Sequence, residues 1–534
     1  MILDNGNVDA TDLSTRLRRG SISRRGFMEG ALAGGLSLAA ATALMDRALA
    51  AVPKRGGTLR MGIGHGSTTD STDPGTFDNG FVNYTFHSIH NRLTEIAADG
   101  SLVGDVAESW DASPDAKTWT FRIRKGMTFH NGKTVTARDV IASLNHHRGE
   151  DATSAAKPIV AAITDIREDD PSTIVISLEG GNADFPFIMA DYHLSILPEK
   201  DGTIDLSGVG TGSYKLESFE PGVRITMSRN GDYWDDGRGH FDAVEALSII
   251  DPNARQNALL TGSIDVADRM ELKTVERVKR KPGMVVKDIT GYQHYTFPMH
   301  VDVAPFNDVD VRMALKLAFK REELVNKILQ GYGTVGNDHP ISKANRYHNS
   351  DLPQRSYDPD KAKWHLKKAG AEGLTVELSA SNAAFAGAVG AAVLYKESAA
   401  AAGINVNVIR EPGDGYWSNV WLKKPWCACY WGGRPTEDQM FSTAYETGVP
   451  WNDTNWSNER FDTLLHEARA ELDEARRREM YYEMQTLVSN DGGAVVPMYA
   501  SYVFGHTDRL AHPDIVGGNW DFDGGRLAER WWFA

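Results

Sequence analysis

The chain has 534 residues, 41% of them hydrophobic and 24% charged, with a formal net charge of −15 at pH 7. A chain of this length buries more core than one domain normally holds, so we expect two or more domains. It has no uncharged apolar run long enough to span a bilayer, which excludes an integral membrane protein. The acidic balance disfavours nucleic acid and anionic lipid as partners, which leaves a small molecule or another protein.

The first fifty residues have the pattern of an export signal. Ser23-Arg24-Arg25-Gly26-Phe27-Met28 precedes an apolar stretch from Gly30 to Met45, and the small-x-small sequence Ala48-Leu49-Ala50 follows. The paired arginines resemble the twin-arginine signal, although an ordinary secretory signal is the alternative. We therefore expect residues 1–50 to be a signal peptide and the mature protein to be exported and soluble in a bacterial periplasm.

Alternation and capping patterns predict the elements of the first half. Residues 58–63 alternate as a strand that leads into a Gly/Ser/Thr/Asp-rich loop ending at Pro74. Residues 117–130 alternate as a half-buried antiparallel strand, followed by an Asn-Gly turn. Thr136 and Asp139 form a capping box for a helix that carries Val140, Ile141 and Leu144 on one apolar face.

The second half has the pattern of an α/β domain. Asp308 is expected to cap a helix that carries apolar residues from Val311 to Ile328, and Asp358-Pro359 to open another that closes at Gly370. A strand near 374–378, an Ala-rich helix over 385–402 and a strand near 404–408 form a strand-helix-strand unit. One or two amphipathic helices are expected over 458–490.

Motifs for catalysis and metal binding are missing from the sequence. It contains no His-Glu-x-x-His, nucleophile elbow, P-loop or complete dinucleotide fingerprint. Cys427 and Cys429 are too close for an unstrained disulfide and cannot supply a four-ligand zinc site. His146-His147 is expected to be an exposed pair at a helix end, and Glu437-Asp438 a solvated or capping pair on a polar loop. We expect no enzyme activity, no metal and no cofactor; an exported hydrolase with a buried carboxylate pair is an alternative that no motif supports.

Aromatic residues are the conspicuous feature of the composition. The chain has thirteen Trp and seventeen Tyr, several in segments broken by Gly or Pro, such as Tyr416-Trp417, Tyr430-Trp431 and Trp451-Asn452. We interpret these segments as loops whose rings could line an apolar slot for a ligand. Packing in the core is the alternative for each ring.

A series of short motifs identifies a family. Gly56-Gly57-Thr58-Leu59, Ala107-Glu108-Ser109-Trp110, Thr118 to Gly126, Phe129 to Val140, Gly210 to Tyr214, Leu260 to Val266 and Pro305 to Leu315 occur in this order. Together they resemble the dipeptide/oligopeptide/nickel class (family 5) of ABC-transporter solute-binding proteins. The resemblance covers nearly all of residues 54–500.

The resemblance implies an α/β, two-lobed periplasmic binding protein fold of type II with a small insert domain. The first lobe would contain residues 54–84, 203–290 and 501–534, the insert residues 85–202, and the second lobe residues 291–500. The chain would cross between lobes near Gly291 and near Pro497-Met498-Tyr499. Such lobes close over a solute only through contacts that the solute makes to both.

The expected function is a monomeric receptor that captures a small solute and delivers it to an inner-membrane ABC permease, with a sensory or assembly role outside transport as the alternative. In peptide-binding relatives an Asp shortly after a Trp pairs with the α-ammonium of the ligand, and here Arg434 occupies that position, with Asp438 as the alternative if the loop shifts. An inter-lobe salt bridge is the alternative role for Arg434. A guanidinium there favours a carboxylate, so we expect an anionic or zwitterionic solute that is peptide-like, amino-acid-derived or opine-like. The candidate ligand-binding residues are Asp73, Tyr84, Tyr292, His294, Tyr295, Trp417, Trp431, Arg434, Asp438, Trp451 and Asn452.

Overall fold

The computed structural model describes residues 52–413 and 415–534, together with residues 13, 22–34, 36–37, 40–42 and 44–45. In the N-terminal part, helix α2 (Arg24–Ala33) begins at the paired arginines, and the Ser23 hydroxyl accepts a hydrogen bond from the Gly26 amide. The expected cleavage sequence Ala48-Leu49-Ala50 lies outside the described residues. Among the helices of the described part, none combines the length and apolar character needed to cross a membrane.

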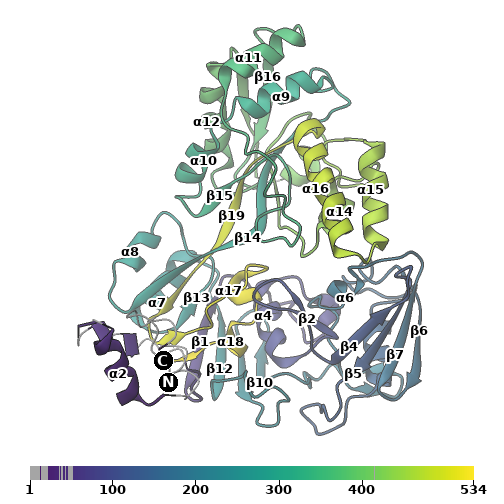
Figure 1. Ribbon diagram of the computed structural model, residues 1–534, viewed down its shortest axis with the longest axis vertical. Helices are drawn as coiled ribbons and strands as arrows, with labels where there is room; N and C mark the ends of the chain where they lie inside the picture. Colours follow the sequence, from purple (N-terminus) through teal and green to yellow (C-terminus); the bar gives the residue numbers. More distant parts are fainter. Residues whose placement is uncertain are drawn as a thin grey trace.

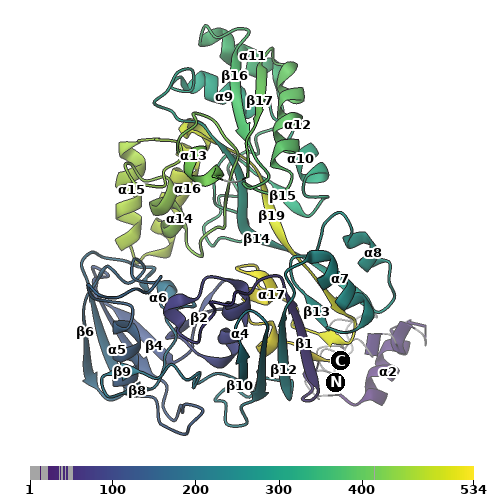
Figure 2. The same ribbon diagram turned by 180° about the vertical axis from the view of Figure 1, so that it is seen from behind.

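Two bodies make up the rest of the chain (Figures 1 and 2). The first body contains the elements from β1 (Thr58–Ile63) to α8 (Val275–Lys279) and from β20 (Leu510–Ala511) to β21 (Trp532–Phe533), and the second those from α9 (Val309–Leu317) to α16 (Glu474–Asp491). The long antiparallel strands β14 (Met284–Pro298) and β19 (Ala494–Thr507) run from one body into the other.

The β14 and β19 pairing is irregular where the two strands leave the first body. Thr290 pairs with Ser501, but the next partners are His294 and Tyr499, so the register shifts across Gly291. A second shift lies between Tyr295 and Phe297. Bulges of this kind bend a strand and increase its local twist, so the only long strands that join the bodies change direction at this position in the described chain.

A mixed sheet forms the centre of the first body and continues into the second. Its strand order is β10-β11-β12-β1-β13-β19-β14-β18, with β15 paired to β19. The predicted strand at 58–63 is confirmed as β1, whose alternate residues Leu59, Met61 and Ile63 are buried. The other bounds are β10 (Tyr214–Glu220), β11 (Arg224–Arg229), β12 (Ala243–Ser248), β13 (Val266–Ala267), β15 (Gly333–Val335) and β18 (Cys429–Trp431).

Short helices cover both faces of this sheet in the first body. The helices α4 (Gly80–Ile89), α17 (Asp521–Gly524) and α18 (Leu527–Arg530) bury Phe81, Phe522 and Trp531 in one core with β1. The helices α7 (Pro252–Thr261) and α8 belong to a second core built around Leu259 and Val275. The C-terminal helices therefore pack beside residues from the beginning of the chain.

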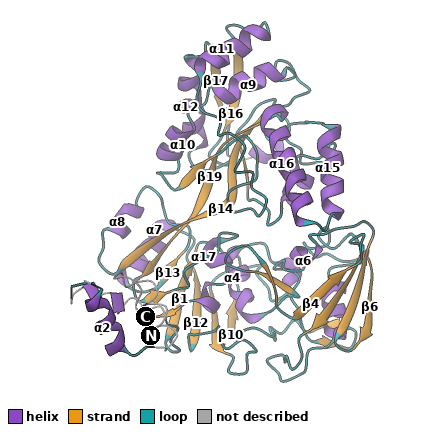
Figure 3. Cartoon of the chain, viewed as in Figure 1, coloured by secondary structure: helices purple, strands orange, loops and turns teal. Residues whose placement is uncertain are grey.

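A separate antiparallel sheet lies at one end of the first body (Figure 3). It contains β4 (Ala107–Ala112), β5 (Thr118–Ile123), β7 (Thr173–Leu178) and β6 (Ile163–Asp170), in that order. Helix α5 (Ala137–Asn145) has the expected Thr136–Asp139 capping box. The strand expected over 117–130 ends at Ile123, because Gly126 turns the chain with a φ of 77°. Small elements complete this region: β2 (Thr94–Ile96), β3 (Leu102–Gly104), α6 (Phe185–Ile188), β8 (Glu199–Lys200) and β9 (Thr203–Ile204).

The second body has the strand-helix-strand unit expected from the sequence. The parallel strands β16 (Thr375–Ala380) and β17 (Asn405–Arg410) are joined by α12 (Ala388–Ala400). Asp358 caps α11 (Pro359–Lys368), and the helices expected over 458–490 are α15 (Glu459–Ala470) and α16. These elements are as predicted.

The single helix expected from Asp308 to Ile328 is wrong. The chain forms α9 and then α10 (Arg321–Lys327), with a break between them. Side chains of α12 donate hydrogen bonds to carbonyl oxygens at the break. The Tyr395 hydroxyl donates to the Leu315 oxygen, and the Ser398 hydroxyl donates to the Ala318 oxygen. The ring of Phe319 packs against Tyr395 at a centroid distance of 3.7 Å. Tertiary contacts therefore replace the helical hydrogen bonds.

Candidate functional site

Two cavities lie where the bodies meet. The larger has a volume of about 500 Å³ and is lined by residues 97–100, 515, 516, 518 and 519 of the first body, by Ile289, Thr290 and Tyr292 of β14, and by Lys343 and Ala344 of the second body. The smaller, about 60 Å³, lies between Asp191, Tyr192 and Trp520 on one side and Pro435 and Gln439 on the other. A molecule held in either space would touch both bodies.

Arg434 lies on the second-body loop that borders the smaller cavity. Its Nη1 donates to the Gly433 carbonyl at 2.8 Å, and no carboxylate of the described residues lies within ion-pairing distance. Burial lowers the pKa of Arg434, while Tyr192 and Asp191 of the first body act in the opposite direction. The guanidinium therefore lies close to the opposing body and has spare hydrogen-bond donors.

The β14 candidates lie beside the β18 candidates. His294 pairs with Trp431 and Tyr295 with Tyr430 across these strands. The His294 ring is fully buried and its Nδ1 lies 3.1 Å from the Tyr292 carbonyl oxygen, while burial lowers its pKa to about 4. Tyr295 stacks on Phe385 at 4.1 Å. A neutral His294 is therefore a packing group at neutral pH in this conformation.

The tryptophan candidates form one aromatic cluster on the second body. Trp417 packs edge-on against Trp421, and Trp421 in turn lies 6.1 Å from both Trp431 and Trp451. Trp431 is 5% exposed, whereas Trp451 is 48% exposed. The expected loops are wrong for two segments, because Tyr416-Trp417 lies in α13 (Tyr416–Asn419) and Tyr430-Trp431 in β18.

Two candidates have their polar atoms engaged by their own body. The Asp438 carboxylate accepts from Arg469 Nε at 2.9 Å. The Asn452 amide donates to the carbonyls of Glu446 and Trp456, and its oxygen accepts from Thr454. These contacts stabilise the local structure of the second body.

Asp73 and Tyr84 lie in the first body. Asp73 caps a short 3-10 helix by accepting from the Gly75 amide, and its Oδ1 is 2.8 Å from His146 Nε2. Tyr84 is buried in α4 and contacts Phe522 edge-on. The expected exposed histidine pair is wrong, because His147 is fully buried with Nδ1 2.7 Å from the Ser154 hydroxyl.

Glu437 and Asp438 are also not the solvated loop pair that the sequence predicts. Thr436 caps α14 (Glu437–Ala444), and both carboxylates are buried in its first turn. The Tyr347 amide donates to Glu437, and burial raises the pKa of Glu437 to about 7. The partners that allow this burial come from segments distant in sequence.

Several site residues have no signal in the sequence. The Asp453 carboxylate accepts from Trp421 Nε1 at 3.2 Å and so holds the tryptophan cluster, and burial raises its pKa to about 6. Tyr192 borders the smaller cavity opposite Pro435. Only the spacing of Trp417 and Trp421, one helical turn apart, could have indicated part of this arrangement.

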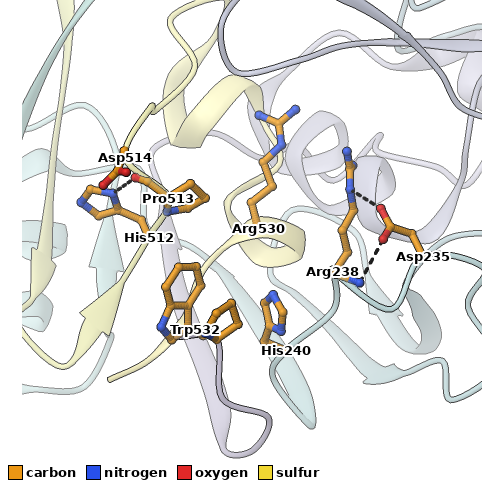
Figure 4. A pocket seen from close by; sticks show the side chains of 10 residues that line it. Asp235, Arg238, His240, His512, Pro513, Asp514, Arg530 and Trp532 are labelled. Carbon is orange, nitrogen blue, oxygen red and sulfur yellow. Dashed lines mark hydrogen bonds and ion pairs between the residues drawn. The ribbon is translucent and has the colours of Figure 1, made fainter. Parts of the chain in front are cut away.

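A further cavity of about 440 Å³ lies on the first body near the C-terminus (Figure 4). Its arginines are already paired: Arg238 with Asp235 and Glu95, and Arg530 with Glu95 and Asp523. All its lining residues belong to the first body, so closure of the two bodies would not enclose it. We do not assign the solute to this cavity.

Cys427 and Cys429 are free and buried, and burial raises the pKa of both thiols. Within the described ranges, no three His, Cys, Asp or Glu side chains are grouped so that they could hold a metal ion.

Comparison with known proteins gives consistent matches over most of the chain. The model of the bacterial extracellular solute-binding proteins, family 5 Middle, matches residues 101–453. The dipeptide-binding protein of Escherichia coli (strain K12) is 25% identical over 451 residues, which are 76% of this chain and 83% of that protein. The glutathione-binding protein GsiB of Pectobacterium atrosepticum is 24% identical over 471 residues, 84% of this chain and 88% of that protein.

Solved structures share the fold. HbpA2 from Haemophilus parasuis superposes with a TM-score of 0.79 at 20% identity, over 87% of this chain and 99% of that one. AgaA from A. tumefaciens R10, in complex with agropinic acid, gives a TM-score of 0.70 at 23% identity, over 90% and 99%. The two-lobed α/β fold expected from the sequence is therefore confirmed. The chain belongs to family 5 of the bacterial extracellular solute-binding proteins.

Proposed function

We propose that this protein captures a small anionic or zwitterionic solute, amino-acid-derived, peptide-like or opine-like, between its two bodies and delivers it to an ABC permease. The observation that carries the proposal is the position of Arg434, a cation with spare donors beside a cavity that both bodies line. Guanidinium groups bind carboxylates through two parallel hydrogen bonds. A free ammonium at this position would be repelled.

The energetics of burial support an anionic partner. A partly buried guanidinium without an ion pair is a costly arrangement, and its lowered pKa reflects that cost. A carboxylate from the solute would offset it. The exposed ring of Trp451 packs against Trp431, which precedes Arg434 by three residues, and it offers apolar contact of a kind that is common in ligand sites.

We also propose the lobe division expected from the sequence. One buried core draws on residues 93–196, others on residues between 297 and 500, and another joins residues 59–89 with residues 504–531. This grouping supports an insert within 85–202, a second lobe at 291–500 and a first lobe from the remaining segments, with the end of α4 up to Ile89 packed in the core of the first lobe. The irregular pairing around Gly291 supports a hinge there.

Export by a twin-arginine signal, a periplasmic location and a monomeric state are parts of the same proposal. The sequence Ser23 to Met28 supports export, and membership of a family of extracellular solute-binding proteins supports a location outside the cytoplasm. A receptor for a permease must reach the outer face of the inner membrane before it can work. Cleavage after Ala50 is the expected processing step.

The experiment is a binding screen on the mature protein. Native mass spectrometry of protein purified from its own host would identify a co-purified solute. Calorimetry with a panel of amino acids, di- and tripeptides, opines and simple amines would then rank solutes by charge. We expect carboxylates to bind and Arg434→Ala to weaken them, because the paired charge is lost. Arg460→Ala, which removes an exposed arginine of the second body, is the control. Tighter binding of simple cations, unchanged in Arg434→Ala, would contradict the proposal.

A further inference from the structure

Asp521 has a buried carboxylate that the protein itself does not satisfy. It lies in α17 and is 4% exposed, and its Oδ1 accepts no hydrogen bond from any described residue. Its one ion pair is a loose one, 3.9 Å from Oδ2 to Nε of Arg269, whose side chain is half exposed. A buried carboxylate normally accepts hydrogen bonds from several donors. Oδ1 of Asp521 has no such donor among the described residues.

The carboxylate two residues further on shows the contrast. Asp523 accepts from Arg530 and from the Gly517 amide through Oδ1, and from Trp531 Nε1 through Oδ2. The same short turn therefore contains one carboxylate that is fully bonded and one that is not. The C-terminal turn is held by Asp523, and Asp521 is not needed for that role.

Asp521 lies among charged groups of both signs: the Asp268 carboxylate and the guanidinium groups of Arg255 and Arg269. Asp268 Oδ2 is also buried and accepts no hydrogen bond from a described residue. Arg255 lies nearby, but its nitrogens bond to Asp268 and to the carbonyls of residues 249, 250 and 269. Burial and the Asp268 charge raise the pKa of Asp521 to about 7. Asp521 and Asp268 therefore each have one buried oxygen that accepts no hydrogen bond from a described residue.

The turn faces the junction between the bodies. Figures 1 and 2 show α17 beneath β14, on the side of the first body nearest the second. The residues immediately before Asp521, Asn519 and Trp520, line the junction cavities. Tyr84 packs on Phe522, and Tyr502 lies under the irregular part of β14, where it fills the space beside Gly291. Aromatic rings around a carboxylate suit an organic ammonium group.

We infer that Asp521, backed by Asp268 and flanked by Tyr84 and Tyr502, is the subsite for an ammonium group of the solute. This inference rests on the proposed function and gives the solute a direction: its ammonium end lies against the first body, and its carboxylate end lies against Arg434 of the second. In peptide-binding relatives, an Asp on the loop that corresponds to residues 431–438 is expected to bind the ammonium group. In this chain Asp521, in α17, would take that role.

The first test uses binding. The probes are L-amino acids and di- and tripeptides with free amines, each paired with its N-acetyl derivative, measured by calorimetry on the full mature protein. We expect acetylation to weaken binding to the wild type by about 30-fold or more, because an anion is left buried without its cation. Asp521→Asn should remove most of that preference. Asp508→Asn, at an exposed carboxylate of the same body, should keep it.

The second test needs no ligand. Without solute, Asp521→Asn should melt about 1–2 °C higher than the wild type at pH 8, because an unsatisfied buried charge is gone. A lower melting temperature in Asp521→Asn would show that the carboxylate is structural and would overturn the inference. So would N-acetyl probes that bind as tightly as free amines. If no carboxylate binds and Arg434→Ala changes nothing, the proposed function fails instead, and the melting test still decides the role of Asp521.

Discussion

Asp184 and Arg477 form a two-pronged ion pair between the two bodies. Arg477 Nη1 donates to Oδ1 at 2.9 Å and Nη2 to Oδ2 at 2.7 Å, and both side chains are almost completely buried. Asp184 precedes α6 of the first body and Arg477 lies in α16 of the second. Arg346 adds a third bond to the same carboxylate. The contact closes the side of the molecule opposite the strands β14 and β19 (Figure 1).

Breaking this pair should destabilise the closed arrangement. Asp184→Asn leaves the buried Arg477 and the more exposed Arg346 beside a neutral group, and the loss of one partner of a buried pair costs about 3–5 kcal/mol. We expect an earlier unfolding transition in urea and a larger radius of gyration by small-angle X-ray scattering. Glu483→Gln, which removes the exposed Arg460 partner, should cost less than about 1 kcal/mol. An unchanged radius and transition would show that the pair does not hold the bodies together.

The tryptophan cluster should divide into a packing part and a binding part. Trp431→Ala should cost about 3–5 kcal/mol in unfolding free energy, because its ring is buried. Trp451→Ala should leave the melting temperature nearly unchanged, because about half of the ring is exposed, but should weaken solute binding. Thermal melts and calorimetry on both variants measure this difference. Equal losses of stability in the two variants would place Trp451 in the core.

Gly433 fixes the position of Arg434. Its φ is 75°, and a Cβ there would lie 2.2 Å from the Tyr292 Cβ. Gly433→Ala must therefore push the loop away from β14, and we expect a loss of solute affinity of about tenfold or more, since small misplacements of a binding group are costly. Gly432→Ala is the matched control, because nothing lies within 4 Å of its added Cβ. Equal affinity in both variants would mean that the loop position does not matter.

Glu437 should make stability depend on pH. Burial raises its pKa from 4.5 to about 7, so the folded state binds this proton more tightly than the unfolded chain does. The contribution of the Glu437 carboxyl group to the free energy of unfolding is fully present below about pH 4.5 and is lost as the pH rises through 7. Glu437→Gln keeps an acceptor for the Tyr347 amide and cannot ionise, so it should be more stable than the wild type above pH 7, by at most about 3 kcal/mol.

Urea denaturation of both proteins at pH 4.5 and pH 8 measures this effect. Glu479→Gln, at an exposed glutamate of α16, should show no such difference. A stability gap between Glu437→Gln and the wild type that does not widen with pH would contradict the assignment.

Local elements with strong signals could be predicted from the sequence. The strand β1, the capping box of α5, the Asp358 cap and the β16-α12-β17 unit follow from alternation and capping, which depend on neighbouring residues only. The break between α9 and α10 could not be predicted, because Tyr395 and Ser398 cause it from about 80 residues away. The same holds for the burial of Glu437, whose partner is the distant Tyr347.

The sequence by itself determined the family, the fold class and the presence of Arg434 on the second-body loop. Motifs that occur in the same order along related chains can be recognised without a structure. The tertiary structure alone decided which charges are already paired. The polar atoms of Asp438 and Asn452 bond to neighbouring residues, whereas Oδ1 of Asp521 accepts no hydrogen bond from a described residue, although no motif marks this position. Whether a buried polar group has a hydrogen-bond partner depends on donors that the fold brings together from distant segments. No pattern of adjacent residues encodes which donors will lie beside it.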